Sequence, residues 1–106
     1  MDTRLRGRRA LVTASSKGLG LACARALIEE GAEVCINGRD PDTLERAAAA
    51  LRQLSAGVRA VVADITTAAG RQRLLEEAGE LDILVTNIGG MAVKPGAAMS
   101  DEDWMR

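Results

Sequence analysis

A turn of small residues lies between a short apolar stretch and a helical pattern early in the chain. It reads Thr-Ala-Ser-Ser-Lys-Gly-Leu-Gly over residues 13–20. Unpaired backbone N–H groups and the positive end of a helix dipole meet at such a turn, which suits a pyrophosphate. Gly18 and Gly20 would let the phosphates or the packed helix come close to the backbone. An ordinary strand-to-helix turn has a similar composition, so the turn alone does not decide between the two.

Other polar residues follow later apolar stretches. Arg39 follows an apolar stretch that ends at Gly38. Asp64 comes directly after the next apolar stretch, and Asn87 comes after the one that follows. Asp64 could also cap a helix, and Asn87 could be a turn residue that bonds its own backbone. Their joint placement after successive apolar stretches favours a ligand site, because parallel sheets bind ligands at the carboxyl ends of their strands.

The elements that would position these residues alternate along the chain. Short apolar runs predict buried strands at residues 9–13, 34–36, 58–63 and 81–86. Capping residues and glycines predict helices over 18–31, from Asp40-Pro41 to Gly57, from Thr66 or Thr67 to Gly79, and from about Ser100. The resulting prediction is an α/β fold with one open parallel sheet.

Apolar residues at helical spacing predict which side of each helix is buried. In the first helix they are Leu19, Ala22, Cys23, Ala26 and Leu27. In the second helix they are Leu44, Ala47, Ala48, Leu51 and Leu54. The first two helices should cover one face of the sheet and the third helix the other, which predicts an incomplete fold with one face less covered.

The same segments resemble the classical short-chain dehydrogenases/reductases. Thr13, Gly18 and Gly20 match the family pattern T-G-x-x-x-G-x-G, with Ala14 at the position of its first glycine. The alanine would be costly only if that position needs a positive φ. Three later segments also match: Asp64-Ile65, the segment Leu84-Val85-Thr86-Asn87-Ile88-Gly89, which resembles L-V-N-N-A-G, and Asp101-Glu102-Asp103-Trp104.

The resemblance implies a Rossmann-like sheet of about four strands in the order 3-2-1-4, with a nicotinamide dinucleotide as cofactor. Residues 1–106 would form one domain, with a lead-in at 1–7, alternating strands and helices at 8–87, and a loop and the start of a fourth helix at 88–106. Asp64 would hold the adenine amino group. The implied cofactor contacts are Thr13, Ser15, Ser16, Lys17, Gly18, Leu19, Gly20, Arg39, Asp64, Ile65, Asn87 and Gly89.

Charge at the end of the second strand predicts which cofactor binds. NAD(H) is usually read by a carboxylate that accepts from the ribose 2′-OH, whereas a 2′-phosphate calls for cations. Here Gly38 stands at that position, and Arg39 and Lys17 flank it. We therefore expect NADP(H) rather than NAD(H). A hairpin turn at Asn37-Gly38 is disfavoured, because Asp40-Pro41 begins a helix directly.

Catalysis by this family, as the resemblance implies, needs a Tyr and a Lys in Y-x-x-x-K, a Ser and an Asn. The chain contains no Tyr, and its segments match only the part that precedes these residues. No catalytic residue is therefore predicted, and the chain alone is expected to be inactive. The intact protein to which this chain would belong is expected to be an NADP-dependent oxidoreductase that acts on CH–OH or C=O groups and forms a homo-oligomer. Two alternatives remain: a stand-alone nucleotide-binding or sensing module, and one half of a split enzyme.

Composition limits the remaining possibilities. A 47% apolar and 27% charged chain is typical of a globular domain. A net charge of −1 argues against a nucleic-acid partner, and no apolar run approaches the roughly 18 residues of a membrane span. We expect a cytoplasmic protein without a metal site, in which Cys23 and Cys35 are buried free thiols.

Overall fold

The computed structural model describes residues 5–16, 18–87 and 91–94, of which residue 87 and residues 91–94 are described by their backbone only. Along the chain it contains β1 (Arg9–Val12), α1 (Gly18–Glu29), β2 (Glu33–Gly38), α2 (Pro41–Arg52), β3 (Arg59–Val62), α3 (Ala68–Ala78), β4 (Ile83–Asn87) and β5 (Met91–Lys94).

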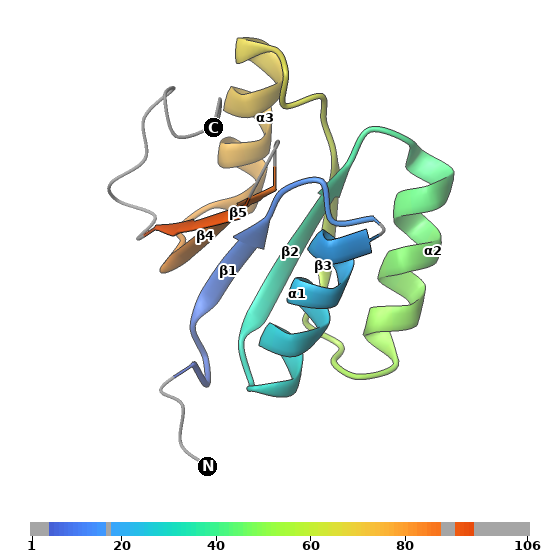
Figure 1. The fold of residues 1–106 in the computed structure, drawn as a ribbon, viewed down its shortest axis with the longest axis vertical. Coiled ribbons are helices and arrows are strands. Elements are labelled where there is room, and N and C mark those ends of the chain that lie inside the picture. The colour runs from blue at the N-terminus through green and yellow to red at the C-terminus, as the bar shows by residue number, and fades with distance from the viewer. Residues whose placement is uncertain (1–4, 17, 88–90, 95–106) are drawn as a thin grey trace.

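These strands form one sheet in the order β3-β2-β1-β4-β5 (Figure 1). The first four are parallel, with Val12 of β1 level with Ile36 of β2 and Val85 of β4. The predicted parallel sheet in the order 3-2-1-4 is therefore confirmed. Because the strands run the same way and are level, the loops that leave β1, β2 and β3 emerge at one end of the sheet.

The fifth strand was not predicted. Residues 88–106 were expected to be a loop and the start of a helix, but Met91–Lys94 pairs antiparallel with β4, with Asn87 opposite Met91. Flanking glycines and a proline favoured a loop there, and a four-residue edge strand depends on its partner more than on its own sequence pattern. The helix expected near Ser100 lies outside the described residues.

Two apolar layers cover the two faces of the sheet. On one face α1 and α2 pack against β1 and β2, with Leu44 of α2 and Val12 of β1 both almost fully buried. On the other face Leu74 of α3 packs with Leu11 of β1 and Leu84 of β4. Successive residues of a strand point to opposite faces, which is why neighbouring Leu11 and Val12 belong to different layers. Two described helices on one face and one on the other agree with the prediction.

The predicted helix starts of α2 and α3 are confirmed. The Asp40 side chain accepts from the Asp42 N–H, with Pro41 at the first helical position, and the Thr67 side chain accepts from the Gly70 N–H. Gly79 follows α3 with a φ of 75°.

The predicted buried stripe of α1 was right only in part: Cys23 and Leu27 pack against the core as expected, but the other three residues of the stripe are exposed. Leu19 is 65% exposed and Ala22 and Ala26 are exposed, whereas the buried residues are Gly20, Ala24 and Ile28. Small residues occupy so much of α1 that two helical phases fit the pattern, and only packing selects one of them. Similarly, α2 ends at Arg52 rather than at Gly57, and Leu54 beyond it is 46% exposed.

The two cysteines are both free thiols. Cys35 is buried as predicted, while Cys23 is only partly buried, and burial raises the pKa of each. None of the helices within the described ranges has the length and apolar character needed to cross a bilayer.

Candidate functional site

The turn after β1 has an unusual backbone conformation. Ala14 has a φ of 48° and Gly18 a φ of 64°, both in the left-handed region that favours glycine. A Cβ added at Gly18 would meet no other described atom within 4 Å, so glycine is needed there for backbone conformation rather than for space inside the protein. The position at which the family has its first glycine therefore does require a positive φ, although it carries an alanine.

Thr13 and Ser15 belong to this turn and are fully buried. The Ser15 hydroxyl donates to the Val12 carbonyl at 2.7 Å, and the Thr13 hydroxyl to the Val85 carbonyl at 3.4 Å. The Ser15 N–H donates to the Asn37 carbonyl at 2.7 Å. These two residues, predicted as cofactor contacts, use their polar groups to tie the turn to β1, β2 and β4.

The rest of the predicted turn leads into α1. Gly18, Leu19 and Gly20 form its first turn, with Gly20 buried and the Leu19 side chain largely exposed at this end of the sheet. Lys17 lies outside the described residues. The turn thus brings an exposed apolar side chain and the start of a helix to the same place.

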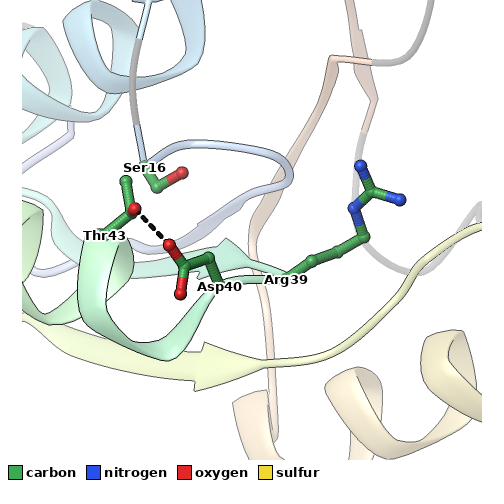
Figure 2. Close-up of a pocket in the computed structure, with 4 residues that line it drawn as sticks. All are labelled: Ser16, Arg39, Asp40 and Thr43. Atoms are coloured by element: carbon green, nitrogen blue, oxygen red, sulfur yellow. Dashed lines mark hydrogen bonds between the residues drawn. The ribbon is translucent and has the colours of Figure 1, made fainter.

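A polar pocket of about 450 Å³ opens beside the turn, lined by Ser16, Arg39, Asp40 and Thr43 (Figure 2). The Thr43 hydroxyl donates to the Asp40 carboxylate, and this bond, followed by the one from the Asp42 N–H, holds the pKa of Asp40 below its ordinary value. In Figure 2 the Arg39 side chain extends away from Asp40. The pocket is therefore lined by a carboxylate already engaged by the start of α2 and by an arginine that is not directed at this carboxylate.

Gly38, at the end of β2, is in close contact with the same pocket. A Cβ at this position would lie 3.2 Å from both Cβ and Oγ of Ser16, and 3.5 Å from Cδ1 of Leu44. Any side chain here would force Ser16 to move. Gly38 also pairs with Val62 of β3, so the alternative hairpin at Asn37-Gly38 is excluded.

Asp64 follows β3 on the neighbouring side of the site. Its Oδ1 accepts from the Thr66 hydroxyl at 2.6 Å and from the Thr66 N–H at 3.0 Å. These bonds hold the pKa of Asp64 below its ordinary value, and the positive charge of Arg39 lowers that pKa further. Arg39 and Asp64, which are distant in sequence, are thus close enough to interact. Ile65 is buried in the layer beneath α3.

Two predicted residues are described only in part or not at all. Asn87 is the last residue of β4, described by its backbone, and Gly89 lies outside the described residues.

Sequence reasoning missed four residues that shape this end of the sheet. Asp40 and Thr43 line the pocket, Asn37 is buried beside the turn, and Gly70 packs on the β3–α3 loop. A Cβ at Gly70 would lie 1.9 Å from the Asp64 carbonyl oxygen, so the loop can pass only over a glycine. The signals were present: Asn37 is a polar residue that ends an apolar run, and Gly70 is a glycine in the first turn of a helix.

A parallel sheet in this order, with a glycine turn leading from its first strand into a helix, defines a Rossmann-like α/β protein. The family model described as short chain dehydrogenase matches residues 8–106. The chain belongs to this family of oxidoreductases, whose members bind a nicotinamide dinucleotide.

Individual relatives agree with this assignment. An uncharacterized oxidoreductase of Bacillus subtilis, YvrD, is 36% identical over 98% of this chain and 40% of its own length. Gluconate 5-dehydrogenase of Gluconobacter oxydans is 35% identical over 94% of this chain and 41% of its own length. The chain thus spans about two fifths of the length of these relatives.

Solved structures resemble the fold closely. L-sorbose reductase from Gluconobacter frateurii, complexed with NADPH and L-sorbose, superposes with a TM-score of 0.80 at 34% identity, over 98% of this chain and 41% of that one. RhlG of Pseudomonas aeruginosa in complex with NADP has a TM-score of 0.74 at 41% identity, over 81% of this chain and 35% of that one.

Proposed function

We propose that this chain forms the NADP(H)-binding part of a short-chain dehydrogenase that transfers a hydride between NADP(H) and a carbonyl or alcohol substrate. One observation carries the choice of cofactor. The end of β2 has a glycine, at which an added Cβ would lie 3.2 Å from Ser16, and Arg39 follows at once, so a cation and a hydroxyl flank a position that carries no carboxylate.

The described residues fit this cofactor by their chemistry. Arg39 and the Ser16 hydroxyl would bind the 2′-phosphate, since both are donors in one open pocket. Lys17 would add a second cation. The start of α1 at Gly18 would face the pyrophosphate, and the Asp64 carboxylate would accept from the adenine amino group. Bound in this way, the cofactor would supply or accept the hydride.

The nearby Asp40 does not oppose this proposal. Its carboxylate caps α2 and accepts from the Thr43 hydroxyl, so the helix N-terminus compensates its charge. In Figure 2 the Arg39 side chain extends away from Asp40, so its guanidinium is not directed at that carboxylate.

The roles of this chain are to bind and orient the cofactor. With no tyrosine in its sequence, it has no candidate for the Tyr acid/base of the family, so we expect the 106 residues alone to bind NADPH without reducing a carbonyl. We place the protein in the cytoplasm. A stand-alone nucleotide-binding module would bind NADPH equally well. The two possibilities, part of a dehydrogenase and stand-alone module, differ in whether adding the family's catalytic segment creates a reductase.

The cofactor preference is tested by removing both cations. Arg39→Ala with Lys17→Ala should weaken NADPH binding by about tenfold to a hundredfold, because charged hydrogen bonds are worth about 1.5–3 kcal/mol each and are partly replaced by water. NADH, which lacks the 2′-phosphate, should lose less than about threefold in affinity by the same reasoning. Calorimetric titration of both cofactors measures the difference.

A matched control removes the same charge elsewhere. Arg25→Ala with Arg73→Ala takes two exposed arginines from α1 and α3 and should leave both affinities within about twofold, because exposed distant charges are screened by salt. Equal losses of NADPH and NADH affinity in the Arg39 and Lys17 variant would overturn the proposed NADP(H) preference.

A further inference from the structure

Asn37 is a buried polar residue at the end of β2 whose side chain joins three strand ends. It is 1% exposed. Its Nδ2 donates to the carbonyl oxygens of Val61 and Ala63, each at 3.2 Å, and its Oδ1 accepts from the Ala14 N–H at 3.1 Å. The carboxamide therefore bridges the end of β3, with the residue that follows it, and the turn after β1.

The orientation of this carboxamide is determined by its partners. Nδ2 faces two carbonyl oxygens, which can only accept hydrogen bonds. A flipped amide would place Oδ1 against these oxygens, with no hydrogen to share. Oδ1 must then face Ala14. An aspartate of the same shape would lack the two donors and would bury a charge, which makes asparagine the residue type that fits.

The atom that Oδ1 holds belongs to the strained residue of the turn. Ala14 has a φ of 48°, a conformation that costs any residue with a Cβ free energy that glycine does not lose. Two further bonds tie the same turn to β2, from the Ser15 N–H to the Asn37 carbonyl and from the Asn37 N–H to the Ser15 hydroxyl. Of these three bonds between the turn and β2, the one to Ala14 depends on which side chain stands at position 37.

We propose that Asn37 is a positioning residue that holds Ala14 in the left-handed conformation and so keeps the turn shaped to receive a pyrophosphate. The proposal rests on the proposed cofactor site. Asn37 is itself buried and would not touch the cofactor. Its effect would depend on Ala14, because a glycine at position 14 would adopt the same conformation without a clamp.

The test is a double-mutant cycle with ADP as the probe, since ADP carries the pyrophosphate and adenine but no 2′-phosphate. In Asn37→Ala, ADP affinity should fall by about fivefold to thirtyfold, the factor that corresponds to the left-handed penalty of alanine. With Ala14→Gly also present, the same substitution should cost less than about threefold, because glycine needs no holding. Equal losses in both backgrounds would overturn the proposal.

A control separates positioning from general loss of stability. Val34→Ala removes buried volume from the same strand, and its effect on ADP affinity should be the same with and without the Ala14→Gly substitution. If Asn37→Ala does not fold, Asn37→Ser takes its place, because the smaller hydroxyl cannot reach all three partners but leaves space for water. The proposal would be overturned if the effect of Val34→Ala on ADP affinity depended on the residue at position 14 as strongly as the effect of Asn37→Ala does.

A second measurement does not need the cofactor. The φ of residue 14, followed by NMR through its intraresidue HN–Hα NOE, should leave the left-handed region in Asn37→Ala and stay there in Val34→Ala. An Ala14 that keeps its φ without Asn37 would overturn the clamp. If the wild-type chain binds neither ADP nor NADPH, the proposed function fails, and the NMR result still decides the conformational role of Asn37.

Discussion

At the scale of single residues, buried polar groups tie the turn after β1 to the neighbouring strands. Ser15 was predicted to contact a cofactor, yet its hydroxyl and N–H are bonded inside the protein. Asn37 was considered only as part of a hairpin. A sequence shows that a polar residue ends an apolar strand, but its partners at residues 14, 61 and 63 come together only once three strands are side by side.

Asp64 makes stability depend on pH in a direction that follows from its hydrogen bonds. Its folded pKa lies below the ordinary 3.8, chiefly because the Thr66 hydroxyl donates to it. The stabilisation is therefore fully present above about pH 4, near the unfolded pKa, and is lost as the pH falls through the lower folded value. Thr66→Val should raise the pKa of Asp64 and reduce this acid-dependent loss, measured by urea unfolding at pH 6 to 3.

Thr66→Ser is the control, because serine keeps the hydroxyl. It should preserve both the pKa of Asp64, read from its carboxyl carbon by NMR, and the pH dependence of unfolding. A Thr66→Val variant with the same acid-dependent loss as Thr66→Ser would contradict the assigned cause.

At the scale of elements, the order and type of most helices and strands were predictable from the sequence. The buried side of α1 and the pairing of β5 were not fully predictable. Caps at Asp40 and Thr67 mark helix starts directly, because a side chain bonds the backbone a few residues away. The buried side of α1 was predicted only in part, since its many alanines and glycines allow two phases. Strand β5 was missed because an edge strand requires a partner that a local pattern does not reveal.

The junction between β3 and α3 depends on one glycine. Gly70→Ala would place a Cβ against the Asp64 carbonyl oxygen, a backbone atom that cannot move without shifting the loop. We expect a loss of at least about 2 kcal/mol in the free energy of unfolding, as for other overpacked sites. Chemical denaturation measures it.

Gly57→Ala is the matched control, because its added Cβ would meet only Ser55 Oγ at 3.8 Å. It should change the unfolding free energy by less than about 0.5 kcal/mol, as is usual for surface substitutions. Similar losses in the two variants would show that the Gly70 contact is not the cause.

At the scale of the whole molecule, the two layers of the core are unequal. Two described helices, α1 and α2, cover one face, while the other face relies on α3 and its contacts to β1, β3 and β4 (Figure 1). This asymmetry was predictable from the alternation of strands and helices, because the hand of each crossover determines the face on which its helix lies. Because of this asymmetry, the packing of the face covered by α3 depends on a few side chains.

Leu74 is central to that face and is fully buried. Leu74→Ala should lower the free energy of unfolding by about 3 kcal/mol, within the range for buried leucines, and should increase amide exchange in α3 more than in α2. Leu54→Ala, which truncates a leucine that is 46% exposed, should cost less than about 1 kcal/mol. Equal exchange in the two helices of Leu74→Ala would show that the layers unfold together.

The contact between Gly38 and Ser16 also affects any redesign of this protein. An engineer who wants NADH in place of NADPH would introduce Gly38→Asp, and the new Cβ would crowd Ser16 at 3.2 Å. That single exchange should therefore weaken the binding of both cofactors. Shortening Ser16 to glycine in the same step removes both atoms that the added Cβ would meet at 3.2 Å, so a test of the proposed cofactor preference should vary the two positions together.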